Sequence, residues 1–427
     1  MRHLGCVLVL LLCSPLVFAQ PSTPWLNEPE RARFEELRRS GLDALYNIDY
    51  DKANRDFKEI AQLYPNHPGG YQLLAARLWI KTLYESRRLQ VSLYSQESFY
   101  GNSEDDKVDP KIITEFRNLT REAKRLAEAK LKQEPKNIEA LDFLANTEGL
   151  KAAFEEAVER RHITALRDGN DAVDHHREVL KLDPKYIDAQ ITIGLYEYVV
   201  GSLPLPVKIF AGATGYRGSK KRGLKLLEQV AQEGRWAQDD AKTVLVLLYT
   251  REQRYEDAVK LTRELSVKYP RNYLLRLETA DGLVSLAAQK RKAGDLIGAV
   301  QAEKEAFATF DEILRDRNVR ETAGRALDLI HFKYGEALFT AGAHERAAKE
   351  YLATTKADHA EPGLVTMAHL YAARSYDVAG KRDEALAQYK EVLARPDIYD
   401  AHEKAKRGLK EAYKAEASGG PSDVSSN

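Results

Sequence analysis

One spacing recurs along this chain: an alanine is followed, twelve positions later, by a proline. It occurs four times, as Ala53 and Pro65, Ala123 and Pro135, Ala172 and Pro184, and Ala258 and Pro270. A tyrosine or an acidic residue precedes each proline, and a polar or basic residue follows it. Proline lacks the amide donor and disfavours helix at the residue before it, so each proline marks the end of a helix. Repetition of this kind predicts an array of small helical units.

Small and aromatic residues occupy matching places around the alanines. A glycine precedes the alanine by about one helix, as Gly41 and Gly335, and Gly194 holds the same place in the middle of the chain. Four residues after the alanine comes an aromatic residue, as Phe57, Tyr351 and Tyr389. Residues four apart share one face of a helix. Each unit is therefore predicted to be two helices that cross closely at small residues.

This pattern resembles the tetratricopeptide repeat, a helix-turn-helix unit of about 34 residues. The match is specific in four windows, which are 34–67, 239–272, 328–361 and 366–399. His359 stands where the third window should have its closing proline, and Pro396 comes one residue early in the fourth. We find no alternating apolar run bounded by turn residues, which a sheet would require. The predicted fold class is all-α, a right-handed superhelical solenoid of tetratricopeptide-like pairs.

The remaining units are predicted to be stretched. About eight helical pairs and a capping helix at 400–414 fill residues 31–416, with insertions near 94–111 and 199–223. The third pair is expected to have a long first helix, about 138–167, that turns at the Asp-Gly-Asn sequence of 168–170. Residues 20–30 are predicted to be an extended lead-in. Residues 417–427, rich in Gly, Ser and Asp, are predicted to be a disordered tail.

The N-terminus reads as a secretory signal peptide over residues 1–19. Arg2 supplies the positive charge, an apolar run follows, and small residues precede a cleavage site after Ala19. An uncleaved anchor and a lipid-modified Cys13 are the alternatives. Because Cys6 and Cys13 are the only cysteines, cleavage leaves 408 residues without any. The mature charge is 64 minus 65, or −1. The expected localisation is exported, either periplasmic or secreted.

Composition limits the function. The chain has 65 Lys and Arg against 65 Asp and Glu, a balance that argues against nucleic-acid binding. Two cysteines exclude a disulfide framework and a four-cysteine zinc site. His175 and His176 are adjacent, so they lie on different sides of a helix and cannot form the usual zinc pair. No nucleophile motif is present. We therefore expect no cofactor, no metal and no enzymatic activity.

The resemblance implies a concave groove lined by the first helix of each unit. Counting from the matched alanines places ten candidate partner-binding residues there: Arg38, Leu42, Leu45, Leu247, Phe332, Glu336, Phe339, Leu370, Arg374 and Asp377. An apolar floor with a charged rim is typical of a protein interface. The alternative is that Phe332, Phe339 and Leu370 contact neighbouring helices only, because one helix face does not reveal what covers it.

The insertion at 199–223 is the second candidate site, because its prolines and glycines prevent one continuous helix. Its apolar part gives way to a basic cluster. The candidate residues are Leu203, Pro204, Pro206, Ile209, Phe210, Tyr216, Arg217, Lys220, Lys221 and Arg222. We consider three roles: a short helix at 207–211 that binds a partner, an apolar tip that contacts an anionic membrane, and a packed loop. The segment also resembles the central region of eukaryotic tetratricopeptide proteins linked to inclusion-body clearance and outer mitochondrial membranes, which implies a shared architecture.

The predicted function is that of an exported scaffold that binds a protein or peptide in its groove, within a cell-envelope assembly. The alternative is a membrane-surface or lipid-interacting adaptor that uses residues 199–222. The partner's identity and the oligomeric state stay open.

Overall fold

The structure is a computed structural model, and it describes residues 24–86, 89, 108–203, 217–322 and 326–415. Within these ranges the secondary structure is helical and no strand occurs. Consecutive helices pack in pairs: α1 (Glu28–Tyr46) with α2 (Tyr50–Leu63), α3 (Pro68–Glu85) with α5 (Pro110–Gln133), α6 (Ile138–Phe154) with α7 (His162–Leu182), α8 (Gln190–Ser202) with α10 (Lys220–Glu233), α11 (Gln238–Arg251) with α12 (Tyr255–Lys268), α13 (Tyr273–Lys292) with α14 (Leu296–Arg315), α16 (Leu327–Thr340) with α17 (His344–Thr354), and α18 (Pro362–Val378) with α19 (Arg382–Leu393). The predicted all-α solenoid is confirmed.

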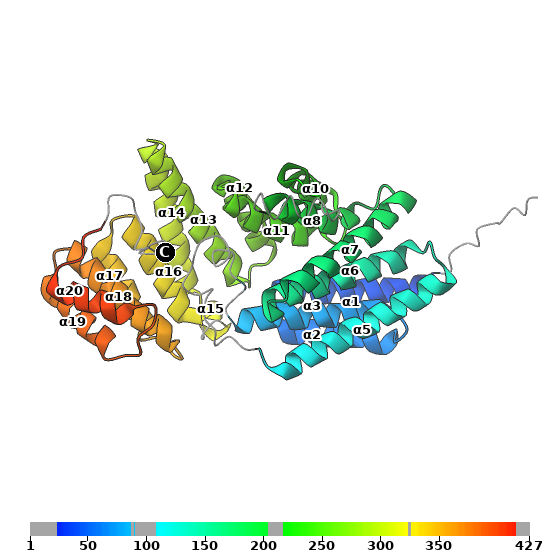
Figure 1. Ribbon diagram of the computed structural model, residues 1–427, viewed down its shortest axis with the longest axis horizontal. Coiled ribbons are helices and arrows are strands. Elements are labelled where there is room, and N and C mark those ends of the chain that lie inside the picture. The colour runs from blue at the N-terminus through cyan, green and yellow to red at the C-terminus, as the bar shows by residue number, and fades with distance from the viewer. Residues whose placement is uncertain (1–23, 87–88, 90–107, 204–216, 323–325, 416–427) are drawn as a thin grey trace, which may run out of the picture.

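The pairs stack side by side along an elongated molecule (Figure 1). The first three pairs form one end, and the last two pairs with α20 (Ala401–Lys410) form the other. Short helices complete the chain: the π-helix η2 (Glu155–Glu159), the 3₁₀ helix η3 (Ile187–Ala189) and α15 (Arg317–Thr322). The largest core cluster runs from α13 to α20, and another, which we term the first core cluster, joins α1, α2, α3, α5 and α6. No helix in the described part of the chain is long and apolar enough to cross a membrane.

The repeated small residues lie where the two helices of a pair cross. All four repeat alanines are buried, and a Cβ added to Gly41 would lie 2.2 Å from the Phe57 ring. A Cβ on Gly335 would lie 2.8 Å from Tyr351, the aromatic residue at the matching place of the seventh pair. Real Cβ atoms do not approach so closely. The sequence interpretation is therefore confirmed: glycine and alanine set the distance between the helices.

The repeat prolines follow the ends of second helices, as predicted. α2 ends one residue before Tyr64-Pro65, and α12 ends one residue before Tyr269-Pro270. Polar side chains then cap the next helices: for example, the Asn137 side chain accepts a hydrogen bond from the amide of Ala140 at 2.9 Å. The turn between α13 and α14 contains Gly294 at φ +85°, a left-handed conformation that favours glycine.

The predicted turn at 168–170 is wrong. The first helix of the third pair ends instead in η2, and the chain reverses at Arg160, which has φ +56°. α7 then runs through the Asp-Gly-Asn sequence without a break. Asp168 is buried there and accepts a hydrogen bond from the Lys151 ammonium on α6 at 2.7 Å. Pairing across the two helices overrides the local turn preference of this sequence.

The two ends of the predicted solenoid differ in how much is described. Residues 1–23, which include the predicted signal peptide, and residues 416–427, which include the predicted tail, lie outside the described residues. The end of the predicted lead-in is described, and Leu26 is buried in the first core cluster. Trp25 packs with its ring centroid 5.0 Å from that of His67. The capping helix α20 is shorter than predicted, because it ends at Lys410.

Candidate partner-binding surface

A largely buried cluster of charged and aromatic side chains, termed the recess below, lies on α13, α16, α17 and α18. Its cation is Lys333 on α16, which is 7% exposed and donates a 2.7 Å hydrogen bond to the Asp281 carboxylate on α13. Burial opposes the charge of Lys333, but the attraction of Asp281 and other nearby carboxylates outweighs it and raises the pKa of Lys333. The ammonium is therefore held in place by its neighbour on the preceding pair.

Glu336 lies one helical turn beyond Lys333 and is partly exposed. Burial raises its pKa to about 7, and the repulsion of Asp281 adds to this shift while the attraction of Lys333 opposes it. Its carboxyl group has no hydrogen bond or ion pair with a described side chain. A half-buried, unpaired carboxyl group with a raised pKa is a candidate for ligand contact.

Aromatic side chains pack beside these charged residues. Tyr351 on α17 is fully buried, and its hydroxyl has no hydrogen-bond partner among the described residues. Burial raises the pKa of Tyr351 well above its usual value, and the charge of Glu336 adds to the shift. Arg374 on α18 is 4% exposed and lies 5.7 Å from the centre of the Tyr371 ring. The recess thus combines a carboxyl group, a guanidinium and aromatic rings.

Asp377, one turn beyond Arg374, is fully buried through its side chain. Its carboxylate accepts hydrogen bonds from the Arg382 guanidinium at 2.7 Å and from the Tyr389 hydroxyl at 2.9 Å. It also accepts a hydrogen bond from the backbone amide of Tyr413 at 2.8 Å. Asp377 therefore joins α18 to α19 and to the segment that follows α20.

The apolar groove candidates of these pairs are buried. Phe332 and Leu370 are 0% exposed, and Phe339 is 4% exposed. Phe332 packs edge-on against Tyr351 and Tyr371, with centroids 5.2 and 5.6 Å apart. These three residues therefore contact neighbouring helices of the chain, which is the alternative to partner binding that the sequence left open.

The groove candidates of the first pair face the chain itself. The Arg38 guanidinium lies 4.2 Å from the centre of the Trp236 ring, which precedes α11. Burial lowers the pKa of Arg38, and nearby carboxylates only partly offset this effect. Leu42 and Leu45 are half-buried against the first core cluster, and Leu247 is half-buried against the cluster of α8 to α12. Arg38 is thus covered by Trp236, whereas the three leucines stay partly exposed.

Contacts with the fifth and sixth pairs hold the first pair in place. The Tyr46 hydroxyl donates a hydrogen bond to Asp240, and its ring stacks on Tyr269 with centroids 4.7 Å apart. The Asn272 side chain donates to the backbone oxygen of Tyr46 at 2.7 Å. Arg271 adds an ion pair with Asp49 at 3.3 Å. The first pair is therefore fixed against pairs that are distant in sequence.

The insertion candidates are only partly described. Pro204, Pro206, Ile209, Phe210 and Tyr216 lie outside the described residues, as does the predicted short helix at 207–211. Leu203 follows the end of α8 as its C-cap residue.

Two of the four cations at the end of the insertion are paired. Lys220 donates to Glu252 at 2.7 Å, and Arg222 donates to the buried Glu197 at 2.6 Å. Arg217 and Lys221 are exposed, without an ion pair to a described residue. These pairs fix the start of α10 to α8 and α11, so half of the basic cluster has a structural role.

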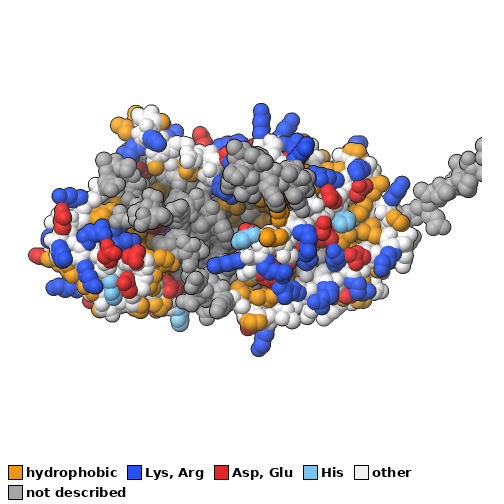
Figure 2. Space-filling model, viewed as in Figure 1, with side chains coloured by type: hydrophobic (Ala, Val, Ile, Leu, Met, Phe, Trp, Pro, Cys, Tyr) orange, Lys and Arg blue, Asp and Glu red, His pale blue; other side chains and the backbone are white. Residues whose placement is uncertain are grey.

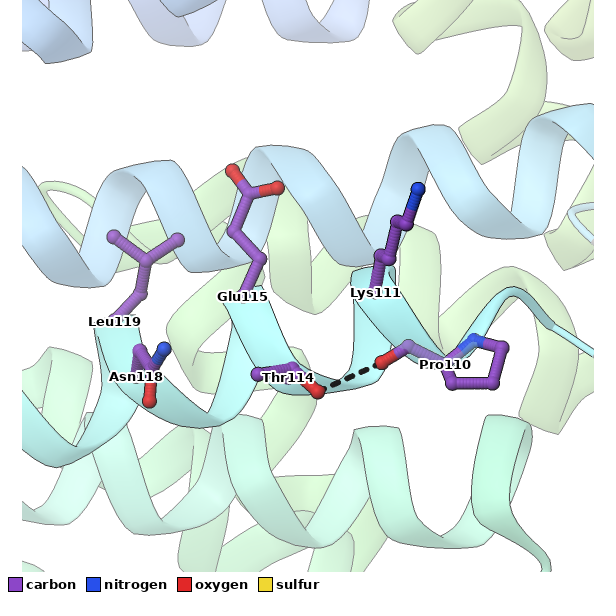
Figure 3. Close-up of a pocket in the computed structure, with 6 residues that line it drawn as sticks. All are labelled: Pro110, Lys111, Thr114, Glu115, Asn118 and Leu119. Atoms are coloured by element: carbon purple, nitrogen blue, oxygen red, sulfur yellow. Dashed lines mark hydrogen bonds between the residues drawn. The ribbon is translucent and has the colours of Figure 1, made fainter.

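Two surface features lie away from the recess. A shallow depression of about 470 Å³ lies on α5 and is lined by Pro110, Lys111, Thr114, Glu115, Asn118 and Leu119 (Figure 3). All six residues belong to one helix, so the depression is open. The tip of the α13–α14 hairpin exposes Leu296, Ile297 and Val300, and it projects from the body (Figures 1 and 2). Over the described ranges, no three His, Cys, Asp or Glu side chains are placed to hold a metal ion.

Sequence reasoning identified three residues of the recess and missed the others. Glu336, Arg374 and Asp377 followed from counting along the repeat. Asp281 and Lys333 lay at positions that the count did not select, although two opposite charges on neighbouring first helices could have suggested them. Tyr413 was not selected because the sequence places it in the capping helix at 400–414, whereas α20 ends at Lys410 and leaves Tyr413 in the segment that follows.

Comparisons with known proteins found matches among solved structures only. No family model matches the chain, and no curated protein matches its sequence. Similar solved structures include a human IFIT1 dimer with m7Gppp-AAAA, at 15% identity and TM-score 0.41, over 90% of this chain and 87% of that one. A thermophilic TPR protein of Thermus thermophilus matches at 16% identity and TM-score 0.33, over 60% of this chain and 99% of that one. Yeast Tom70 matches at 13% identity and TM-score 0.30, over 88% of both chains.

Proposed function

We propose that this protein is an exported scaffold that binds an extended segment of a partner protein in the recess of its last pairs. The observation that carries the proposal is the Glu336 carboxyl group, which is half-buried and unpaired among described side chains beside an ordered cation. A group of this kind costs stability unless a ligand uses it. The recess comprises Glu336, which is partly exposed, and Lys333, Arg374 and Tyr371, which are buried beside it.

A protein segment fits this surface better than a nucleic acid. The chain as a whole has no net charge, and anionic and cationic side chains are mixed over the face seen in Figure 2. Nucleic-acid binding requires a surface with a clear excess of cations. The recess instead pairs opposite charges with aromatic rings, which is the usual anatomy of a protein interface.

The proposal is tested by affinity capture from envelope extracts with the chain that begins at residue 20. Glu336→Gln removes the charge of the recess and keeps its shape. Glu384→Gln is the matched control, because Glu384 is exposed on the second helix of the eighth pair. We expect a partner that the unchanged chain and the control retain and the Glu336 variant loses. Equal capture by both variants would place the binding surface elsewhere, and a variant lacking residues 203–219 then tests the insertion.

The membrane-surface alternative rests on the apolar and basic residues of the segment 199–222. The ion pairs of Lys220 and Arg222 use half of the basic cluster within the protein. Flotation with anionic vesicles separates the two functions, because a scaffold stays at the bottom of the gradient. Co-flotation that is lost in the double variant Arg217→Ala and Lys221→Ala would favour the membrane function.

A further inference from the structure

The segment after α20 lies across the recess of the eighth pair. α20 ends at Lys410, and Glu411 has the extended angles φ −136° and ψ 138°. Residues 411–415, which we term the strap, then pass over α18. The backbone amide of Tyr413 donates to the Asp377 carboxylate at 2.8 Å, and the Arg374 guanidinium lies 4.6 Å from the centre of the Tyr413 ring. The strap thus contacts two residues that the repeat pattern assigns to partner binding.

These contacts have the form in which extended peptides are bound. A main-chain hydrogen bond holds the backbone of a peptide, and a pocket receives a side chain beside it. A guanidinium over an aromatic ring adds a cation–π attraction. Here Asp377 supplies the acceptor, and Arg374 supplies the cation, which itself lies over Tyr371.

The receiving groups are held by contacts that do not involve the strap. Asp377 is fixed by Arg382 and Tyr389, at 2.7 and 2.9 Å. Tyr371 packs against Phe332 and Tyr351. A site with these supports keeps its shape when the strap leaves.

The strap is largely exposed. The side chains of Glu411 and Lys414 are 75% and 83% exposed, and they pair with each other at 3.7 Å. Ala412 and Tyr413 are partly buried, and Tyr413 packs against the core cluster of α13 to α20 and contacts α18 through its ring and its amide. Segments with few buried contacts open at a low free-energy cost.

We propose that the strap is an intramolecular ligand: it occupies a site for an extended partner segment that carries a tyrosine or phenylalanine. The inference deepens the proposed function and rests on it. Partner binding at this site requires the strap to leave, and the partner's aromatic residue takes the place of Tyr413. The strap competes at an effective concentration of the order of millimolar, as short tethers do.

The test uses the full chain from residue 20 and a fluorescein-labelled synthetic peptide with the sequence of residues 409–415. Tyr413→Ala weakens the strap, and Lys414→Ala is the matched control on the same segment. We expect the Tyr413 variant to bind the peptide about fivefold or more tightly than the unchanged chain and the control. A peptide with alanine in place of its tyrosine should bind none of them. Equal peptide affinity for all three chains, with unchanged circular dichroism, would overturn the proposal.

A second measurement does not depend on a variant that folds. Excess peptide added to the unchanged chain should increase hydrogen exchange at the amide of Tyr413 as it displaces the strap. Unaltered exchange at a saturating peptide concentration contradicts the proposal. If the strap fails these tests while Glu336→Gln still loses a captured partner, the scaffold function stands and the strap is a structural cap. If the strap passes and the capture fails, the site takes aromatic peptides without the envelope partner.

Discussion

Tyr46, the last residue of α1, stacks on Tyr269, the C-cap residue of α12, with the two rings inclined by only 15°. The hydroxyl group of Tyr46 also donates to Asp240 at the start of α11. Burial raises the pKa of Tyr46 well above its usual value, and the charge of Asp240 contributes to the shift. The phenol is therefore a neutral donor at every physiological pH. This contact joins the first pair to the fifth pair.

The Tyr46 contact should stabilise the arrangement of the first pair. Tyr46→Ala removes an aromatic stack and a hydrogen bond, so we expect a loss of about 2 kcal/mol in the free energy of unfolding. Urea unfolding measures the loss, and hydrogen exchange should be faster at the end of α1. Tyr71→Ala is the control, because the Tyr71 hydroxyl donates a 3.3 Å hydrogen bond to the carbonyl of Pro65, which is close to it in sequence. Equal losses for both variants would show that the long-range contact adds nothing.

Helix crossing predicts opposite effects for two glycine substitutions. A methyl group on Gly41 would lie 2.2 Å from Phe57, so Gly41→Ala should cost about 1–3 kcal/mol. The nearest atom to a Cβ on Gly149 is 3.9 Å away. Gly149→Ala should therefore stabilise α6 by about 0.5–1 kcal/mol, because alanine favours helix. Thermal midpoints of the two variants should move in opposite directions, and a shift in the same direction contradicts the crossing geometry.

Ionisation of Glu336 should make stability depend on pH. Its pKa is raised to about 7 in the folded chain, so between about pH 4.5 and 7 the folded state binds more protons than the unfolded state. The stabilisation is fully present below pH 4.5 and is lost as the pH rises through 7. Glu336→Gln, which mimics the protonated form, should be about 1–3 kcal/mol more stable than the unchanged chain at pH 8 and nearly equal at pH 4.5. The same difference at both pH values would show that Glu336 titrates normally.

The ion pairs after the insertion predict a contrast between two neighbouring cations. Glu197 is 5% exposed and accepts hydrogen bonds from Arg222 and from the amide of Ser219. Arg222→Ala leaves this carboxylate short of a partner, so we expect a loss of about 1–3 kcal/mol. Lys221→Ala should change stability by less than about 0.5 kcal/mol, since Lys221 is exposed. The urea midpoints of the two variants measure this contrast. An Arg222→Ala variant with unchanged stability would show that the ion pair with Glu197 has no structural role.

The sequence by itself determined the repeat architecture, because small residues, aromatic residues and prolines act through local geometry. Gly41 with Phe57 and Gly335 with Tyr351 mark helix crossings at a fixed spacing, and Pro65 and Pro270 end their helices wherever the pair lies. The count from these marks also placed Glu336, Arg374 and Asp377 together on one side of the last pairs.

Tertiary structure alone decided which positions are covered. Asp168 and Gly169 carry a turn signal, yet the ion pair of Asp168 with Lys151 keeps them in α7. Arg38 has the same repeat position as Phe332 and Leu370, which neighbouring helices bury, whereas Trp236 lies over the Arg38 guanidinium. Tyr413 reaches Arg374 because α20 ends where the chain can pass over α18. Such contacts join residues far apart in sequence, and their pairing depends on how successive units are rotated, which no local pattern specifies.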